Sequence, residues 1–209
     1  VAGNMSASLS AYNGQVASVT IVGVNTSATV TGTLPITGAT HTINGNLTIG
    51  TVTGSSSSFD PGTTASKAIG TLGYKFTGVR ITAGSAEDVR LKSVRFYQAG
   101  SASAADLSNV KIYVDGTAYE AVASERYYTA NFGSGIVIAK GLAKDVWISG
   151  DITGSNSSGR TIDFDIQKNT DLYLAGETYG QGLIYTGTVN STASTATPAI
   201  VGYTVTVSA

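Results

Sequence analysis

The 209-residue sequence has no cysteine, a single histidine and few charged residues. Without cysteine no disulfide can form, and one imidazole with no thiolate leaves a zinc site without its usual ligands. We therefore expect neither a transition-metal centre nor another cofactor. The net charge of −1 excludes binding of nucleic acid by electrostatic attraction, because no basic excess is present to displace phosphate counterions. No apolar run approaches the ~18 residues that predict a transmembrane segment.

The few charged residues are confined to the middle of the chain. All of the Asp, Glu, Lys and Arg residues lie between Asp60 and Glu177. An even distribution would place roughly 11 of them in the two terminal segments. Exposed strand edges are normally protected from edge-to-edge association by charges or by proline. We therefore expect the uncharged terminal strands to be covered by another molecule.

Residues with alternating polarity predict β-strands along nearly the whole chain. Near the N-terminus, small apolar side chains alternate with hydroxyl-bearing ones, which predicts a strand at residues 5–12 with one apolar face. That face consists of Met5, Ala7, Leu9 and Ala11. Asn13 and Gly14 then form a turn, and further strands are expected at residues 16–24, 28–36 and 41–53. In the charged middle, a change of face near Ser93 predicts a β-bulge.

Short strands separated by turn residues predict an all-β protein whose fold is an antiparallel β-sandwich of the Ig-like or jelly-roll type. The Ser-rich segment 54–58 lies where the uncharged part of the chain gives way to the charged part. This change in composition places the domain boundary there. Residues 1–60 are expected to form an uncharged N-terminal strand extension, and residues 61–209 the sandwich domain.

Three segments of the middle region carry a resemblance to a known class of module. They are residues 76–91 (FTGVRITAGSAEDVRL), 106–117 (DLSNVKIYVDGT) and 146–152 (VWISGDI). Together they resemble Ig-like β-sandwich modules of bacterial and archaeal cell-surface proteins, over roughly residues 70–170. The resemblance implies a sandwich fold and a location at the cell surface.

The uncharged N-terminal extension is similar in character to the donor segments of filament subunits. These include chaperone–usher pilins, bundling pili and TasA-like matrix fibres, whose donor segments alternate small apolar side chains. The resemblance implies assembly by donor-strand exchange, in which one subunit's strand pairs with its neighbour. Met5, Ala7, Leu9 and Ala11 are the donor-strand candidates.

The sequence offers little for catalysis. His41 lies in an uncharged, Thr-rich strand with no carboxylate nearby to orient its imidazole, as acid–base catalysis requires. Asp163 and Asp165 lie on the same face of one strand, about 7 Å apart. Two such carboxylates are typical of a solvated strand face. They are also candidates for a calcium site and for a pair of catalytic acids. We expect that the protein is not an enzyme.

The aromatic residues allow the hypothesis of a carbohydrate-binding protein, because planar aromatic rings stack on sugars. Tyr127 and Tyr128 are neighbours in a strand and must face opposite sides, so only one of them can join a platform. Trp147 stands between Val146 and Ile148, a context typical of a buried core residue.

Five Asn-x-Ser/Thr sequons make the chain a candidate glycoprotein. Glycans at these sites would solubilise a surface with few charges. The candidate asparagines are Asn4, Asn25, Asn46, Asn156 and Asn190.

These observations lead to one hypothesis and two alternatives. The hypothesis is an extracellular, cell-surface structural subunit of a filament or pilus, a head-to-tail homopolymer whose principal partner is a second copy of itself. An S-layer or adhesin-type surface module is the first alternative. The second is a carbohydrate-binding β-sandwich.

Overall fold

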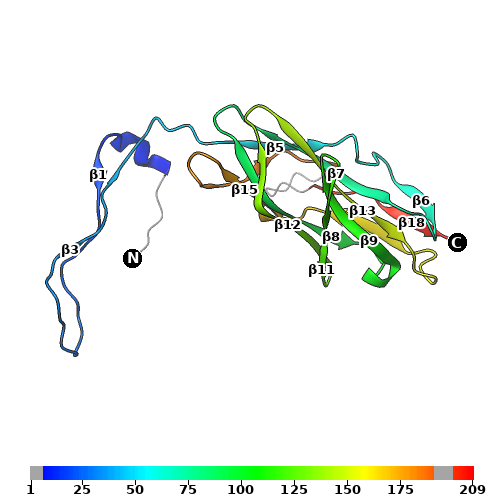
Figure 1. The fold of residues 1–209 in the computed structure, drawn as a ribbon, viewed down its shortest axis with the longest axis horizontal. Coiled ribbons are helices and arrows are strands. Elements are labelled where there is room, and N and C mark those ends of the chain that lie inside the picture. The colour runs from blue at the N-terminus through cyan, green and yellow to red at the C-terminus, as the bar shows by residue number, and fades with distance from the viewer. Residues whose placement is uncertain (1–6, 191–199) are drawn as a thin grey trace. The chain divides into compact units, whose positions relative to one another are not determined.

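The computed structural model describes residues 7–190 and 200–209 and divides the chain into two compact units, the first ending at Thr48 and the second beginning at Ile49. The fold is all-β (Figure 1). Within the described part, the helices are short 3₁₀ turns, Ala7–Tyr12 (η1), Ala104–Asp106 (η2) and Asn169–Asp171 (η3). No helix in residues 7–190 or 200–209 has both the length and the apolar character needed to cross a membrane.

Two main sheets pack face to face in the second unit, so the predicted β-sandwich is confirmed. The first sheet has the order β10-β9-β13-β7-β5-β17. Its strands are β5 (Val52–Ser56), β7 (Tyr74–Ala83), β9 (Leu107–Val114), β10 (Thr117–Glu120), β13 (Ala143–Ile152) and β17 (Tyr185–Thr186).

The second sheet has the order β11-β12-β8-β14-β18-β6, and β15 pairs with both β8 and β16. Its strands are β6 (Ala65–Ala68), β8 (Val89–Ala99), β11 (Val122–Ser124), β12 (Tyr127–Ile138), β14 (Thr161–Asp165), β15 (Leu172–Gly176), β16 (Gly182–Leu183) and β18 (Val205–Ser208). Most pairs are antiparallel, as expected. The pairs β5–β17 and β6–β18 are parallel, so the sheets are mixed.

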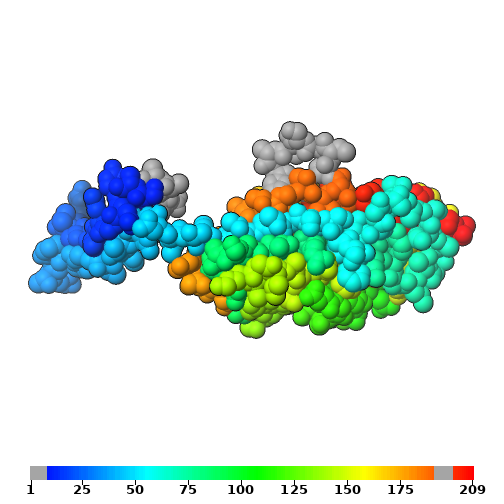
Figure 2. Space-filling view, turned by 90° about the horizontal axis from the view of Figure 1, so that it is seen from above, coloured from blue at the N-terminus to red at the C-terminus, as the bar shows by residue number. Residues whose placement is uncertain are grey.

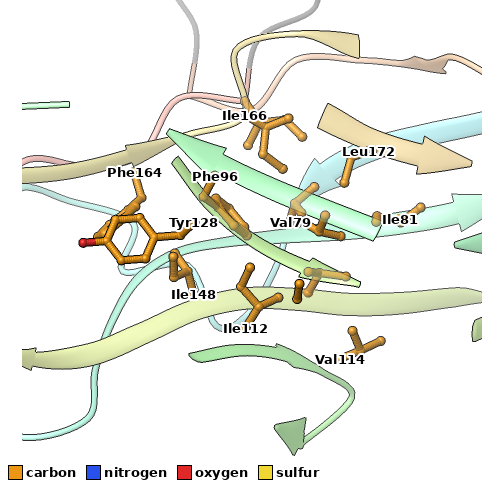
Figure 3. Packing of buried hydrophobic residues seen from close by; sticks show 14 of the residues in the cluster. Val79, Ile81, Phe96, Ile112, Val114, Tyr128, Ile148, Phe164, Ile166 and Leu172 are labelled. Carbon is orange, nitrogen blue, oxygen red and sulfur yellow. The ribbon is translucent and has the colours of Figure 1, made fainter. Parts of the chain in front are cut away.

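The core lies between the two sheets and follows from the period of two along each strand. One sheet contributes residues such as Val79, Ile112 and Ile148, and the other contributes Phe96 and Phe164 (Figure 3). All five side chains are fully buried. The change of face predicted in β8 is confirmed: the register against β15 shifts between Ser93 and Leu91, and Leu91, Val94 and Phe96 all point into the core.

The chain crosses from one sheet to the other at both lateral sides of the sandwich. On one side β10, the outer strand of the first sheet, is followed directly by β11, the outer strand of the second. On the other side β16 of the second sheet is followed by β17 of the first. The chain itself therefore bridges the two sheets on both sides, and the core residues of the described part are buried without any second chain.

The first unit is a two-stranded antiparallel ribbon, which we call the arm (residues 7–48). Its strands are β1 (Val16–Ala17), β2 (Thr20–Ile21), β3 (Ile36–Thr37) and β4 (His41–Thr42), and β1 pairs with β4 and β2 with β3. The strands are much shorter than the expected 16–24, 28–36 and 41–53.

Two further expectations differ from the structure. Residues 7–12 form the 3₁₀ helix η1 and not a strand, because the described chain supplies no partner strand along this segment. The expected boundary after residue 60 differs from the division between Thr48 and Ile49, because β5 pairs with β7 and so belongs to the sandwich.

Candidate functional site

The most unusual surface of the molecule is the arm, where apolar side chains are exposed along an uncharged ribbon. Between Ser10 and Thr48, every residue is exposed except Ile43 and Gly45, which are half-buried. Large apolar side chains with 38–79% of their surface exposed are Val16, Val19, Ile21, Val22, Val24, Val30, Leu34, Ile36 and Leu47. The arm therefore presents apolar surface without forming a core.

The backbone of the arm is held by few interactions. Gly14 N–H donates to the Ile43 carbonyl oxygen at 2.8 Å, and Ile43 N–H donates back to the Gln15 carbonyl oxygen at 2.8 Å. The Thr20 and Thr37 hydroxyls lie 3.1 Å apart across the ribbon. An isolated two-stranded ribbon is only marginally stable in water. Within residues 7–48, no third strand and no apolar layer covers this ribbon.

The structure does not present the donor-strand candidates as one apolar strand face. Ala7, Leu9 and Ala11 lie in η1, and Met5 lies outside the described residues. Leu9 is half-buried and Ala11 is exposed. Their role as donors stays a prediction, while the exposed strands of the arm are β1 to β4. His41 lies on β4 and is exposed.

On the sandwich, an aromatic stack covers the outer face of the first sheet. The Trp147 ring on β13 is sandwiched between Phe59 at 4.0 Å and Tyr113 at 5.1 Å, centroid to centroid. The Lys75 ammonium lies 4.6 Å from the Phe59 ring centroid and 5.7 Å from that of Trp147, within cation–π range. Trp147 is buried, as predicted, but on the outer face of the sheet and not in the core cluster.

The loop that carries Phe59 crosses this sheet at Gly78, where a side chain would collide with it. A Cβ on Gly78 would lie 2.7 Å from the backbone nitrogen of Asp60. The Asp60 carboxylate fixes the loop by accepting hydrogen bonds from the backbone N–H groups of Gly62 and Gly78, both at 3.1 Å. Gly78 therefore permits the packing that covers Trp147.

Beside this stack lies an open depression of about 410 Å³, which we call the end depression. It is lined by residues 58–61 of the loop after β5 and by residues 72–75 at the start of β7. Leu72, at its rim, is 75% exposed. The sequence reasoning missed this feature. Its only signal is an apolar residue placed in a turn between Gly70 and Gly73, both of which adopt positive φ.

A second buried cluster lies where the chain enters the sandwich. The Glu87 carboxylate accepts hydrogen bonds from the backbone N–H groups of Gly50 at 2.7 Å, Thr178 at 2.9 Å and Tyr179 at 3.3 Å, and from Gln181 Nε2 at 3.1 Å. Burial disfavours the charge, but these hydrogen bonds outweigh it and lower the pKa of Glu87. Glu87 thus anchors the start of β5 to the turn before β16.

Asp163 and Asp165 are half-buried rather than solvated. The Asp165 carboxylate accepts a hydrogen bond from the Gly202 N–H at 2.9 Å, and Asp163 accepts one from the Thr204 hydroxyl at 3.2 Å. Burial raises the pKa of Asp163 and raises that of Asp165 to about 6. Among the described residues, no third His, Cys, Asp or Glu joins these two in a group that could hold a metal ion. Their role as calcium ligands stays a prediction.

Tyr127 and Tyr128 face opposite sides of β12, as predicted. Tyr128 is buried in the core with its ring 5.3 Å from that of Phe164, and Tyr127 lies on the outer face beside Tyr97 at 5.1 Å. The Tyr97 and Tyr127 rings are tilted by 59° relative to each other. They do not form the coplanar platform of a sugar-binding site.

The sequons differ in accessibility. Asn25, Asn46 and Asn156 are exposed, so their side chains are open to modification. The Asn190 amide nitrogen donates to the Val201 carbonyl oxygen at 3.1 Å and lies 3.4 Å from Asp60 Oδ1, so a glycan there would replace these contacts. Asn4 lies outside the described residues.

Comparison with known proteins adds no relative to these observations. The sequence matches no model of a known protein family, and no curated protein matches it either.

Proposed function

We propose that the protein is a structural subunit of an extracellular filament or pilus, in which the arm of one subunit pairs with a neighbouring copy by β-strand complementation. One observation carries the proposal: the arm exposes large apolar side chains on an uncharged ribbon that has no core of its own. Such a surface is a template for pairing with another chain unless something covers it. A neighbouring subunit supplies that cover.

A comparison of free energies favours strand pairing over apolar contact alone. Covering nine half-exposed aliphatic side chains contributes on the order of 10 kcal/mol at ~1 kcal/mol each. Bringing two molecules together costs an estimated ~4–15 kcal/mol. Apolar burial alone therefore roughly balances the cost of association. The backbone hydrogen bonds of an added strand supply the surplus and fix the orientation of the arm.

The arm adds to a neighbour whose sandwich is already closed. Completion of an open sandwich, as in donor-strand exchange, requires an unfilled core, whereas the described core is buried by its own chain. We therefore place the complementation on the outer surface or an edge of the neighbouring sandwich. A contact between two different surfaces that does not close on itself generates a filament.

Paired substitutions in the arm test the proposal. Ile21 and Ile36 are register partners in the β2–β3 pair, and both side chains are exposed. In the double variant Ile21→Asp/Ile36→Asp, two adjacent carboxylates would have to be buried on docking, so we expect filaments to disappear in electron micrographs and the protein to sediment as a monomer.

The matched control is Val122→Asp on β11, a side chain of similar exposure on the sandwich. This variant should retain filaments. Normal filaments from the arm variant would contradict the proposal. A two-dimensional lattice formed by the unaltered protein would favour the S-layer alternative, and saturable binding of a defined glycan by a monomer would favour the carbohydrate-binding alternative.

A further inference from the structure

Because the proposed function requires a surface that receives the arm, we infer that the end depression receives the arm of a second copy of this chain. The inference rests on the proposed function and names the acceptor surface within it. It is carried by the position of the depression on the sandwich, by its apolar walls, and by the absence of charge from the arm.

The end depression lies at the opposite end of the sandwich from the point where the arm joins it. β5 and β7 are antiparallel: Val52, close to the junction at Ile49, pairs with Ala83, while the depression lies at Tyr74, at the other end of β7. Ala83 and Tyr74 are roughly 30 Å apart at ~3.4 Å per residue. In Figures 1 and 2 the cyan segment runs along the sandwich between these two ends.

This placement gives the contact a direction. An arm that leaves one end of a subunit and docks at the opposite end of the next uses two different surfaces, so the same contact can repeat along a line.

The chemistry of the depression suits an uncharged, apolar occupant. Phe59, Pro61, Leu72 and Tyr74 supply apolar surface. The Asp60 carboxylate accepts hydrogen bonds from the N–H groups of Gly62 in its own loop and Gly78 on β7. Lys75 is exposed, and its ammonium lies over the Phe59 and Trp147 rings, so it can stay in contact with water at the rim.

A second, smaller depression of about 220 Å³ on the outer face of the second sheet is a poorer match. Its walls include Arg90, Lys92 and Glu177. Arg90 and Glu177 pair with each other, with the two nitrogen–oxygen distances at 2.7 and 2.6 Å. Covering this ion pair and Lys92 with an uncharged ribbon would cost desolvation energy that the arm has no charge to offset. The arm, with no Asp, Glu, Lys or Arg, therefore favours the end depression.

A charge placed at the rim tests the acceptor. In the full-length variant Leu72→Asp we expect the critical concentration for polymerisation to rise about tenfold or more, equivalent to about 1.4 kcal/mol. The control is Leu142→Asp, a turn residue with 62% of its surface exposed against 75% for Leu72. Neither side chain lies in the core, so both variants should unfold thermally like the parent protein, and the control should polymerise normally.

Cross-linking gives a second test, because the chain has no cysteine of its own. A Leu72→Cys chain mixed with Val16→Cys, Ile21→Cys or Ile36→Cys chains should give an intermolecular disulfide with at least one of them during polymerisation. The same three chains mixed with a Leu142→Cys chain should give none. A disulfide requires Cα atoms within about 7 Å, so the link reports direct docking.

The outcomes separate this inference from the proposed function. If Leu72→Asp polymerises normally and no link to position 72 forms, while Ile21→Asp/Ile36→Asp abolishes filaments, the arm docks elsewhere and the acceptor assignment is wrong. If none of the substitutions affects polymerisation, or the parent protein forms no polymer, the proposed function fails as well.

Discussion

At the scale of a single residue, the ionised carboxylate of Asp165 destabilises the folded state. Burial is the main reason why the pKa of Asp165 rises to about 6, and the neighbouring Asp163 raises it further, while the Gly202 N–H lowers it. An exposed aspartate in the unfolded chain has a pKa of about 3.9. Between these two values the folded state binds more protons than the unfolded state.

We predict that Asp165→Asn stabilises the protein at neutral pH. The folded state favours protonated Asp165 more than the unfolded state does. As the pH rises from about 4 to about 6, Asp165 loses this proton, so its contribution to the free energy of unfolding falls and stays low above pH 6. The substitution should raise the free energy of unfolding by about 1–2 kcal/mol at pH 8, with the gain vanishing below about pH 4. Urea unfolding across this pH range measures it.

Asp115 provides a control of opposite sign. Although burial opposes its charge, hydrogen bonds from the Lys144 ammonium and the Asp145 N–H lower the pKa of Asp115. Asp115→Asn should therefore reduce stability at neutral pH, and the loss should shrink as the pH falls. A pH-independent gain from Asp165→Asn would contradict this explanation.

At the scale of elements, a side chain from one part of the chain fixes the ends of strands in other parts by accepting hydrogen bonds from their backbone. Glu87, in the turn between β7 and β8, connects Gly50, two residues before β5, with the turn before β16. Gly176 at the end of β15 has no side chain and so permits this contact, since a Cβ there would lie 2.6 Å from Glu87 Oε1. Three separate segments thus depend on one carboxylate.

We predict that Glu87→Ala destabilises the sandwich by about 3 kcal/mol, because it removes the acceptor of the buried Gly50 N–H and of the partly buried N–H groups of Thr178 and Tyr179. Glu87→Gln keeps one carbonyl oxygen and should cost less. Urea unfolding at pH 7 measures both. Equal losses for the two variants would show that packing, and not hydrogen bonding, is the role of this side chain.

At the scale of the whole molecule, stability and assembly belong to different parts of the chain. Every residue of the hydrophobic core cluster lies between Val52 and Val207, within the second unit. The large exposed apolar residues of the arm lie outside it. The sandwich supplies folding free energy, and the arm supplies the surface that we propose for assembly.

Deletion of residues 1–48 should therefore leave a folded monomer. We expect the free energy of unfolding of the sandwich to change by less than about 1 kcal/mol, because residues 7–48 contribute no member of the described core cluster. Polymerisation should be lost. Thermal unfolding and sedimentation velocity measure the two properties. A truncated protein that unfolds would show that the arm stabilises the sandwich, and one that still forms filaments would exclude the arm from assembly.

Local sequence patterns predicted the sandwich and several of its details, because side-chain alternation depends only on neighbouring residues. Local patterns predicted three details that the structure confirms. These are the change of face near Ser93, the opposite orientations of Tyr127 and Tyr128, and the burial of Trp147. The same reasoning failed for residues 7–12. Their alternation fits a strand, but a strand exists only with a partner, and the structure gives this segment none.

The sequence by itself determined the fold class and the separation of charged from uncharged segments, since both follow from residue type and order. Only the tertiary structure decided that Phe59 covers Trp147 on the outer face, that β17 and β18 pair in parallel with β5 and β6, and that the described core is buried within one chain. These features join residues far apart in the sequence. Their positions depend on the packing of the two sheets, which no local pattern specifies.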